Sequence, residues 1–225
     1  MKLLIDRFRD YYPKDIKEAK EIQNEVSSLV QLKPYNDKFK LIGGIDTAYK
    51  DDKVISAICV IDSESHKIVE KVYGIIKKGF PYVPTFLAFR EVPAIIRAFD
   101  NLTGIPDIFL VDGHGICHPR GVGIATHIGV LMGIPTIGVA KSRLVGDFVM
   151  PDYKKGKYEP IIFNNNTVGY IFRSRDNVKP IFISPGHLTD LRCIIRIVEK
   201  SLGRYRIPDP LRYAHIFAEE MKKEV

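Results

Sequence analysis

Residues 107–140, DIFLVDGHGICHPRGVGIATHIGVLMGIPTIGVA, carry the clearest signal of the fold. They contain two short apolar runs, which are typical of strands that are buried on both faces of a parallel sheet. The first run ends at Asp112, and the second spans Thr136 to Ala140. A helix over about Gly121 to Met132 fits between them, so the stretch predicts a β-α-β unit with two parallel strands.

Three β-rich apolar runs precede this unit, separated by short polar turns. Such connections predict a three-stranded antiparallel meander over Phe39 to Tyr49, Val54 to Asp62 and Lys67 to Ile76. Helices are predicted on either side of the meander. The first follows a capping pair, Asp15 and Glu18, and the second covers about Phe86 to Leu102 with a bend at Pro93.

After the β-α-β unit the pattern predicts three more strands and two helices. They cover Pro160 to Phe163, Val168 to Arg173, Pro180 to Ile183, Leu188 to Leu202 and Pro210 to Lys222. A meander followed by alternating strands and helices is typical of an α/β protein with a mixed sheet flanked by helices. With no linker-like stretch among the 225 residues, we expect one domain over residues 1–225.

Composition narrows the class of protein. The chain is 45% hydrophobic and 27% charged, with 34 basic against 27 acidic residues and a net charge of +7. Basic residues concentrate in 141–157 and 192–212, which favours a polyanionic partner. Three scattered cysteines argue against a disulfide scaffold or a zinc ribbon. No apolar run is suited to a signal peptide or a membrane span, so we expect a cytoplasmic monomer without a membrane partner.

Several acidic residues stand where a charge is costly. Asp46 lies among small residues in the first strand, and Asp112 ends a buried strand at the edge where ligands bind in α/β sheets. Lys141 follows the next parallel strand and should emerge at that same edge. Glu91 lies on the apolar stripe of the Phe86 to Leu102 helix.

Each acid alone equally fits a buried residue paired with an arginine. Together, oxygen ligands from Asp46, Glu91 and Asp112 would suit a hard cation, Mg²⁺ or Mn²⁺. His215, on the last helix, is either a packed residue or a ligand or base. No Walker A, G-x-G-x-x-G or G-x-S-x-G motif is present, which argues against nucleotide-cofactor enzymes and serine hydrolases.

The order of these elements and acids resembles the ribonuclease H-like nuclease fold. Eight strings then resemble, in order, those of the endonuclease V family of deoxyinosine-directed repair nucleases. They are Gly44-Ile-Asp46, Pro81-Tyr-Val-Pro84, Phe89-Arg-Glu91, Val111-Asp-Gly-His-Gly115, His118-Pro-Arg120, Gly138-Val-Ala-Lys-Ser-Arg-Leu144, Ser184-Pro-Gly-His187 and Arg206-Ile-Pro. The resemblance covers about residues 15–215, nearly the whole chain.

The resemblance implies roles for the acidic and basic residues. Asp46 and Asp112 would bind the metal directly, Glu91 and His215 would orient metal-bound water or bind the metal themselves, and Lys141 would contact the scissile phosphate. The reaction would be Mg²⁺-dependent hydrolysis of the second phosphodiester bond 3′ of deoxyinosine in DNA, leaving 3′-hydroxyl and 5′-phosphate ends.

The resemblance also implies a base-recognition site. Tyr82, within the string Pro81-Tyr82-Val83-Pro84, would be a wedge that fills the gap left by a flipped base. The flanking prolines would hold its exposed ring rigidly. The alternative is that Tyr82 is an aromatic residue at the rim of the core. A tight pocket is expected near Gly113, His118 and Gly186. Thr85 stands where a smaller residue is expected, and its bulk should narrow the pocket.

Rival functions share parts of this pattern. An endoribonuclease that acts on inosine in RNA would carry the same residues. A non-catalytic nucleic-acid-binding module of the same fold is disfavoured by the three acids and Lys141. A junction resolvase of this fold gives no reason for the Pro81-Tyr-Val-Pro84 string.

Overall fold

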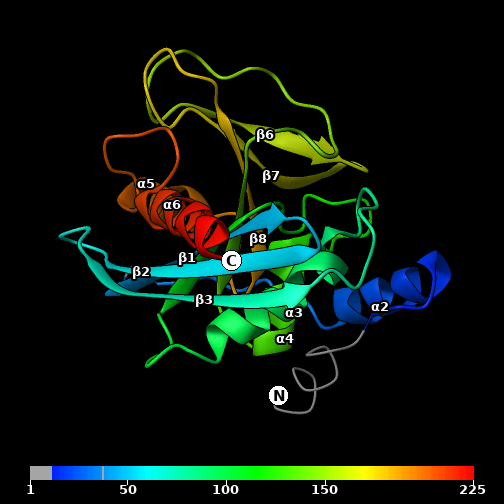
Figure 1. The fold of residues 1–225 in the computed structure, drawn as a ribbon. Helices are drawn as coiled ribbons and strands as arrows, with labels where there is room; N and C mark the ends of the chain where they lie inside the picture. The colour runs from blue at the N-terminus through cyan, green and yellow to red at the C-terminus, as the bar shows by residue number, and fades with distance from the viewer. Residues whose placement is uncertain (1–11, 37) are drawn as a thin grey trace.

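The computed structural model describes residues 12–36 and 38–225. Eight strands form one mixed sheet in the order β3-β2-β1-β4-β5-β8-β7-β6, with helices on both faces (Figure 1). The strands are β1 (Leu41–Lys50), β2 (Lys53–Asp62), β3 (Ile68–Lys77), β4 (Ile108–Asp112), β5 (Thr136–Ala140), β6 (Tyr158–Phe163), β7 (Asn166–Phe172) and β8 (Ile181–His187). The predicted fold class, a ribonuclease H-like mixed sheet flanked by helices, is confirmed.

The described helices are α2 (Ile16–Ser28), α3 (Leu87–Phe99), α4 (Ile124–Met132), α5 (Ile194–Lys200) and α6 (Asp209–Glu224). Helix α2 starts as predicted, because the Asp15 carboxylate accepts a hydrogen bond of 2.8 Å from the backbone N–H of Glu18. Pro93 lies within α3, also as predicted. None of these helices, within the described part of the chain, has the length and apolar composition that a membrane crossing needs.

The pairing of the strands follows the sequence pattern. Strands β1, β2 and β3 form the antiparallel meander, and β4 and β5 are parallel to each other and joined through α4. Because β1 also pairs in parallel with β4, the carboxyl end of β4 lies beside the middle of β1. Asp46 and Asp112 are therefore brought to neighbouring strands.

The alternation of side chains along β4 divides the core into two layers. Phe109 and Val111 pack with α3 and α4, whereas Ile108 and Leu110 pack with α5 and α6 on the opposite face. Figure 1 shows α6 lying across β1 and β2, on the face opposite α3. The apolar residues that read as continuous runs in the sequence are buried because both faces are covered.

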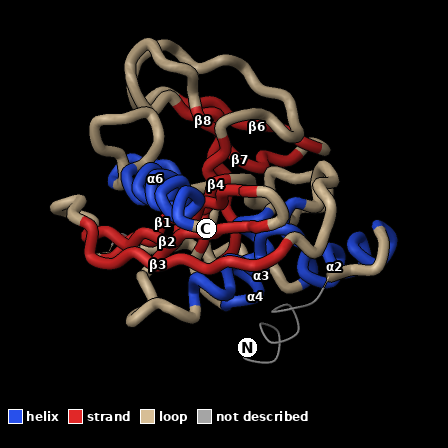
Figure 2. Tube along the Cα trace, viewed as in Figure 1, coloured by secondary structure: helices blue, strands red, loops and turns tan. Residues whose placement is uncertain are grey.

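Two predicted bounds are wrong by more than three residues. The helix predicted over Leu188 to Leu202 is shorter, because Leu188 has a φ of +52° and the Asp190 carboxylate accepts hydrogen bonds from the backbone of Arg192 and Cys193. The strand predicted to end at Ile183 continues to His187. The backbone N–H of His187 donates a hydrogen bond to Thr136 Oγ1 at 3.0 Å. Pairing of β8 with β5 therefore continues past Pro185. Connections 141–157 and 201–208 remain loops (Figure 2).

Candidate active site

Two aspartates share one edge of the sheet. The parallel register pairs Ile45 of β1 with Val111 of β4, so Asp46 and Asp112 are the next residues along the two strands. Burial and the negative charge of Asp112 raise the pKa of Asp46 to about 6. Only 9% of Asp46 is exposed, so its carboxylate needs compensating partners.

Each aspartate holds a basic partner. His215 on α6 places Nδ1 2.7 Å from Oδ2 of Asp46, and Lys141, which follows β5, donates from Nζ to Oδ2 of Asp112. Burial lowers the pKa of Lys141, but the carboxylates of Asp112 and Asp46 together outweigh burial and leave the pKa of the lysine raised. The predicted convergence of Asp46, Asp112, Lys141 and His215 is thus observed.

Helix α6 approaches β1 closely because residue 44 is a glycine. A Cβ atom at Gly44 would lie 2.2 Å from the carbonyl oxygen of Pro210, at the start of α6. Asp46 lies on the same face of β1 as Gly44, which explains how His215, one turn farther along α6 than Leu211, reaches the aspartate. In the string Gly44-Ile-Asp46, the glycine therefore allows close helix packing, and the aspartate supplies the carboxylate that contacts His215.

Glu91 approaches the same edge from α3. Its carboxyl group accepts a hydrogen bond from the Tyr49 hydroxyl, and the side chain is 7% exposed. Burial, with the charges of Asp46 and Asp112, raises the pKa of Glu91 to about 8. The three predicted acids thus lie within electrostatic reach of one another.

The fit of this site to a metal rests on its donors. No three Asp, Glu, His or Cys side chains gather as a ready-made metal site in residues 12–36 and 38–225. Instead Glu91 bonds Tyr49 and Asp112 bonds Lys141. The available donors are nevertheless carboxylate oxygens whose mutual repulsion a divalent cation would relieve, and oxygen donors are those that Mg²⁺ and Mn²⁺ prefer.

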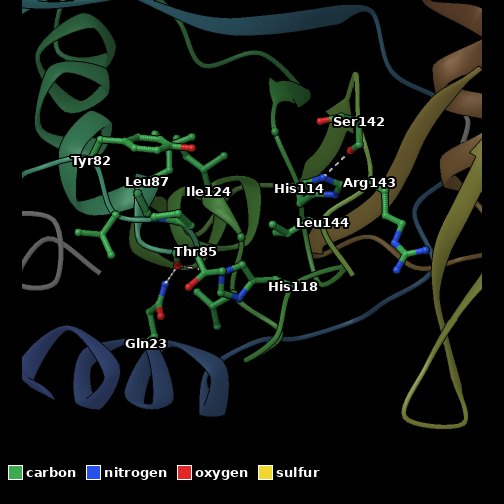
Figure 3. A pocket seen from close by; sticks show the side chains of 16 residues that line it. Gln23, Tyr82, Thr85, Leu87, His114, His118, Ile124, Ser142, Arg143 and Leu144 are labelled. Atoms are coloured by element: carbon green, nitrogen blue, oxygen red, sulfur yellow. Dashed lines mark hydrogen bonds between the residues drawn. The ribbon is translucent and has the colours of Figure 1, made fainter. Parts of the chain in front are cut away.

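A cavity of about 230 Å³ opens beside this edge (Figure 3). The loop carrying Tyr82, Val83, Pro84 and Thr85 forms one wall. The rest of its lining includes Gly113, His114, His118, Ile124, Ser142, Arg143 and Leu144. Tyr82 is 67% exposed at the rim, so it is available for contact with a ligand rather than packed in the core.

Thr85 anchors the Tyr82 loop to the rest of the protein. Its carbonyl oxygen accepts hydrogen bonds from Gln23 Nε2 at 2.8 Å, His118 Nε2 at 2.9 Å and Arg120 Nη2 at 3.2 Å. Arg120 Nη2 also donates to Oγ1 of Thr85 at 2.6 Å. Thr85 has a φ of +72°, which is strained for a β-branched residue and persists only because the surroundings hold it.

The two histidines of the cavity are neutral in ordinary buffers. Burial lowers the pKa of His118 to about 4, and its Nδ1 accepts from the backbone N–H of Arg120 while Nε2–H donates to Thr85. Burial also lowers the pKa of His114, whose Nε2 lies 3.0 Å from the carbonyl oxygen of Ser142. Both rings therefore serve as fixed hydrogen-bonding groups.

Two predicted substrate-binding residues do not line this cavity. Gly186 lies buried in β8, where a Cβ atom would be 2.2 Å from Thr136 Oγ1, and Pro81 precedes the lining part of its loop. Gln23 was missed, although it is the one polar residue among the buried positions of α2 and is 1% exposed. A buried glutamine on an apolar helix face is the signal that could have identified it.

Comparisons with known proteins agree with this geometry. The sequence profile of the endonuclease V family matches residues 24–216. An endonuclease V from Dictyoglomus thermophilum is 40% identical over 203 residues, which cover 90% of this chain and 89% of that protein. The crystal structure of endonuclease V from Streptomyces avermitilis superposes with a TM-score of 0.90 at 35% identity, covering 95% of each chain.

A third relative was solved with a ligand. It is endonuclease V from Ciona intestinalis in complex with a 24mer DNA containing an inosine followed by a ribo-adenosine. It superposes with a TM-score of 0.81 at 29% identity and covers 93% of this chain and 98% of its own. The profile match over most of the sequence, and relatives at 35–40% identity along nearly their whole length, show that this chain belongs to the endonuclease V family.

Proposed function

We propose that the protein is a DNA repair endonuclease that recognises deoxyinosine and hydrolyses the second phosphodiester bond 3′ of it. The observation that carries the proposal is the adjacency of two features: the Asp46–Asp112 edge with Lys141, and the cavity whose rim holds the exposed Tyr82. Family membership and the inosine-containing DNA bound by the Ciona intestinalis relative support it.

Recognition would begin with extrusion of the damaged base. Unstacking a base costs a few kcal/mol, and a ring inserted at the gap offsets part of that cost. Tyr82 is the exposed ring at the rim, and Thr85 fixes its loop before the substrate arrives. The extruded hypoxanthine would enter the cavity between this loop and His118, where polar groups are held in place by the surrounding backbone.

Cleavage would occur at the neighbouring sheet edge. Asp46 and Asp112, with Glu91, would hold Mg²⁺, and Mn²⁺ would substitute for it as a chemically similar ion. When bound, the metal supplies activated water and stabilises charge on the phosphoryl oxygens. The Lys141 ammonium would contact a non-bridging oxygen of the scissile phosphate, and His215, held through Nδ1 on Asp46, would orient water. The nick would leave 3′-hydroxyl and 5′-phosphate ends.

The test compares matched substrates. One labelled duplex carries a single deoxyinosine, its twin carries deoxyadenosine, and a third substrate carries inosine in RNA; each is incubated with Mg²⁺ or with chelator. We expect a Mg²⁺-dependent nick in the deoxyinosine strand alone. Cleavage of only the RNA would replace this proposal with an inosine-specific endoribonuclease, and binding without cleavage of any substrate would replace it with a binding module.

A further inference from the structure

A second cavity, of about 360 Å³, lies against the same catalytic edge. Its lining includes Asp112, Lys141 and His215 of the proposed catalytic edge, together with Tyr205, Arg206 and Arg212. The first cavity and the proposed mechanism assign no role to these last three residues as a group. The second cavity therefore needs its own explanation.

The ends of β4 and β5 separate the two cavities. Asp112 and Lys141 line the second cavity, whereas the residues that follow them, Gly113 and Ser142, line the first. A DNA strand that places a base in the first cavity and its phosphodiester backbone at Lys141 would continue toward the second. The two cavities thus flank the proposed position of the scissile phosphate.

The second cavity contains groups that stack on nucleobases. The guanidinium carbon of Arg212 lies 3.8 Å from the ring centroid of Tyr205, and the Tyr205 side chain is 46% exposed. Aromatic rings and arginine guanidinium groups both stack on bases without sequence preference. A nucleotide that enters this cavity would meet two planar groups already placed against each other.

The loop that carries Tyr205 is fixed in place. Arg206 donates from Nε to the carbonyl oxygen of Lys179 at 2.7 Å and from Nη2 to that of Pro180 at 2.8 Å. The Ser174 hydroxyl in turn donates to the carbonyl oxygen of Arg206 at 2.7 Å. Because these bonds tie the loop to the strand region beside Lys141, Tyr205 is positioned without a ligand.

The charges also suit a nucleotide. Lys141, Arg206 and Arg212 line the cavity against one carboxylate, that of Asp112. An excess of positive charge favours a phosphate-bearing ligand over a neutral one. Ile207 and Leu211 supply apolar surface for the base.

We propose that the second cavity binds the nucleotide on the 3′ side of the cleaved bond, with its base stacked on the Tyr205–Arg212 pair. This inference rests on the proposed function. For a cut at the second phosphodiester 3′ of deoxyinosine, this nucleotide is the second one 3′ of the lesion, and it carries the 5′-phosphate formed by cleavage. Base stacking here would hold the product end of the strand in register with Asp112 and Lys141.

The test pairs variants of the protein with variants of the substrate. Dissociation constants are measured for a deoxyinosine duplex, for the same duplex with an abasic analogue at the second nucleotide 3′ of the lesion, and for a control with the analogue at the fourth. The proteins are wild type, Tyr205→Leu and Tyr205→Phe. Tyr73→Ala is the matched control, because Tyr73 is 40% exposed on β3 and lines neither cavity.

We expect removal of the second base to weaken wild-type binding about tenfold, and Tyr205→Leu to weaken binding to the complete duplex by a similar factor. On the duplex that lacks this base, Tyr205→Leu should cause no further loss, and Tyr205→Phe and Tyr73→Ala should behave as wild type. Equal losses for Tyr205→Leu with and without the second base would overturn the inference. The inference would also be overturned if Tyr205→Leu bound the complete deoxyinosine duplex as tightly as the wild type does. This holds even if the wild-type protein nicks only at deoxyinosine. Absence of any preference for deoxyinosine over deoxyadenosine would instead refute the proposed function.

Discussion

Nδ1 of His215 lies 2.7 Å from Oδ2 of Asp46, although the two residues are 169 positions apart in the sequence. The contact joins α6 to β1 at the proposed catalytic edge. It depends on the close approach of α6 to β1, which the absence of a side chain at Gly44 allows. Packing and chemistry are therefore coupled at this point of the fold.

Gly44→Ala should separate α6 from β1. The added Cβ would lie 2.2 Å from a backbone oxygen, which cannot yield as a flexible side chain would. We expect a loss of about 1–3 kcal/mol in the free energy of unfolding, measured in urea, and a fall in nicking rate. Gly104→Ala is the control, because a Cβ there meets nothing within 4 Å. Equal stability and activity of the two variants would contradict the role of Gly44.

Tyr82→Ala should weaken binding to deoxyinosine duplex more than binding to plain duplex. Base–aromatic stacking contributes about 1–3 kcal/mol, so a decrease of about tenfold or more in the affinity ratio is expected. Tyr82→Phe keeps the ring and should retain the ratio. Fluorescence anisotropy with the two duplexes measures it, and a ratio unchanged in Tyr82→Ala would refute the wedge.

Thr85→Val tests the anchor of the Tyr82 loop. Valine keeps the volume and the strain at φ +72° but loses the hydroxyl that accepts from Arg120. Because a hydrogen bond to a charged group contributes about 1.5–3 kcal/mol, we expect a loss of about that size in unfolding free energy. Thr85→Ser, which keeps the hydroxyl, should lose less. A valine variant as stable as wild type would show that the bond contributes nothing.

Burial of His127 should contribute a loss of stability in mild acid, which the raised pKa values of Glu91 and Asp46 oppose. This histidine is fully buried in α4, and burial lowers its pKa to about 3, whereas the unfolded chain has a value near 6.5. The unfolded state therefore binds the proton first, and this contribution to stability is lost as the pH falls below about 6.5. From pH 6.5 to 5 the loss is about 2 kcal/mol.

His127→Leu removes this contribution, so the unfolding free energy of the wild type relative to the variant should fall by about 2 kcal/mol between pH 7 and pH 5. His118, with a pKa lowered to about 4, and Glu91 and Asp46, with pKa values raised to about 8 and about 6, remain in both proteins and cancel in this difference. Urea unfolding at pH 5 and pH 7 measures both proteins. Parallel pH profiles for wild type and His127→Leu would contradict the assignment.

The sequence predicted the parts of the fold whose signals are local. The runs ending at Asp112 and Ala140 are strands because they are buried on both faces, and the β-α-β connection follows from their spacing. The length of the helix predicted before Leu202 was overestimated. The turn at Leu188 and Asp190 depends on hydrogen bonds from backbone N–H groups to the Asp190 carboxylate, which hydrophobic periodicity does not reveal.

The same limit applies to the site. Asp46, Asp112 and Lys141 were predictable because parallel strand ends meet at one edge. Gln23 was not, because it acts through a hydrogen bond to Thr85, 62 residues away. Gly186 was predicted to lie at the pocket because it belongs to the motif Ser184-Pro-Gly-His187. In the structure it packs against Thr136 instead. Long-range contacts of this kind are set by tertiary packing rather than by spacing.

In the proposed function, the Asp46–Asp112 edge cuts the strand whose damaged base occupies the Tyr82 cavity. The most direct test maps the cut on a sequencing ladder, with wild type and with Asp46→Asn and Asp112→Asn, on a duplex carrying one deoxyinosine and Mg²⁺. We predict a single wild-type cut at the second phosphodiester 3′ of deoxyinosine, reduced more than about a hundredfold in both variants while binding persists. Full activity of either variant, or a cut that does not move with the position of deoxyinosine, would contradict the account.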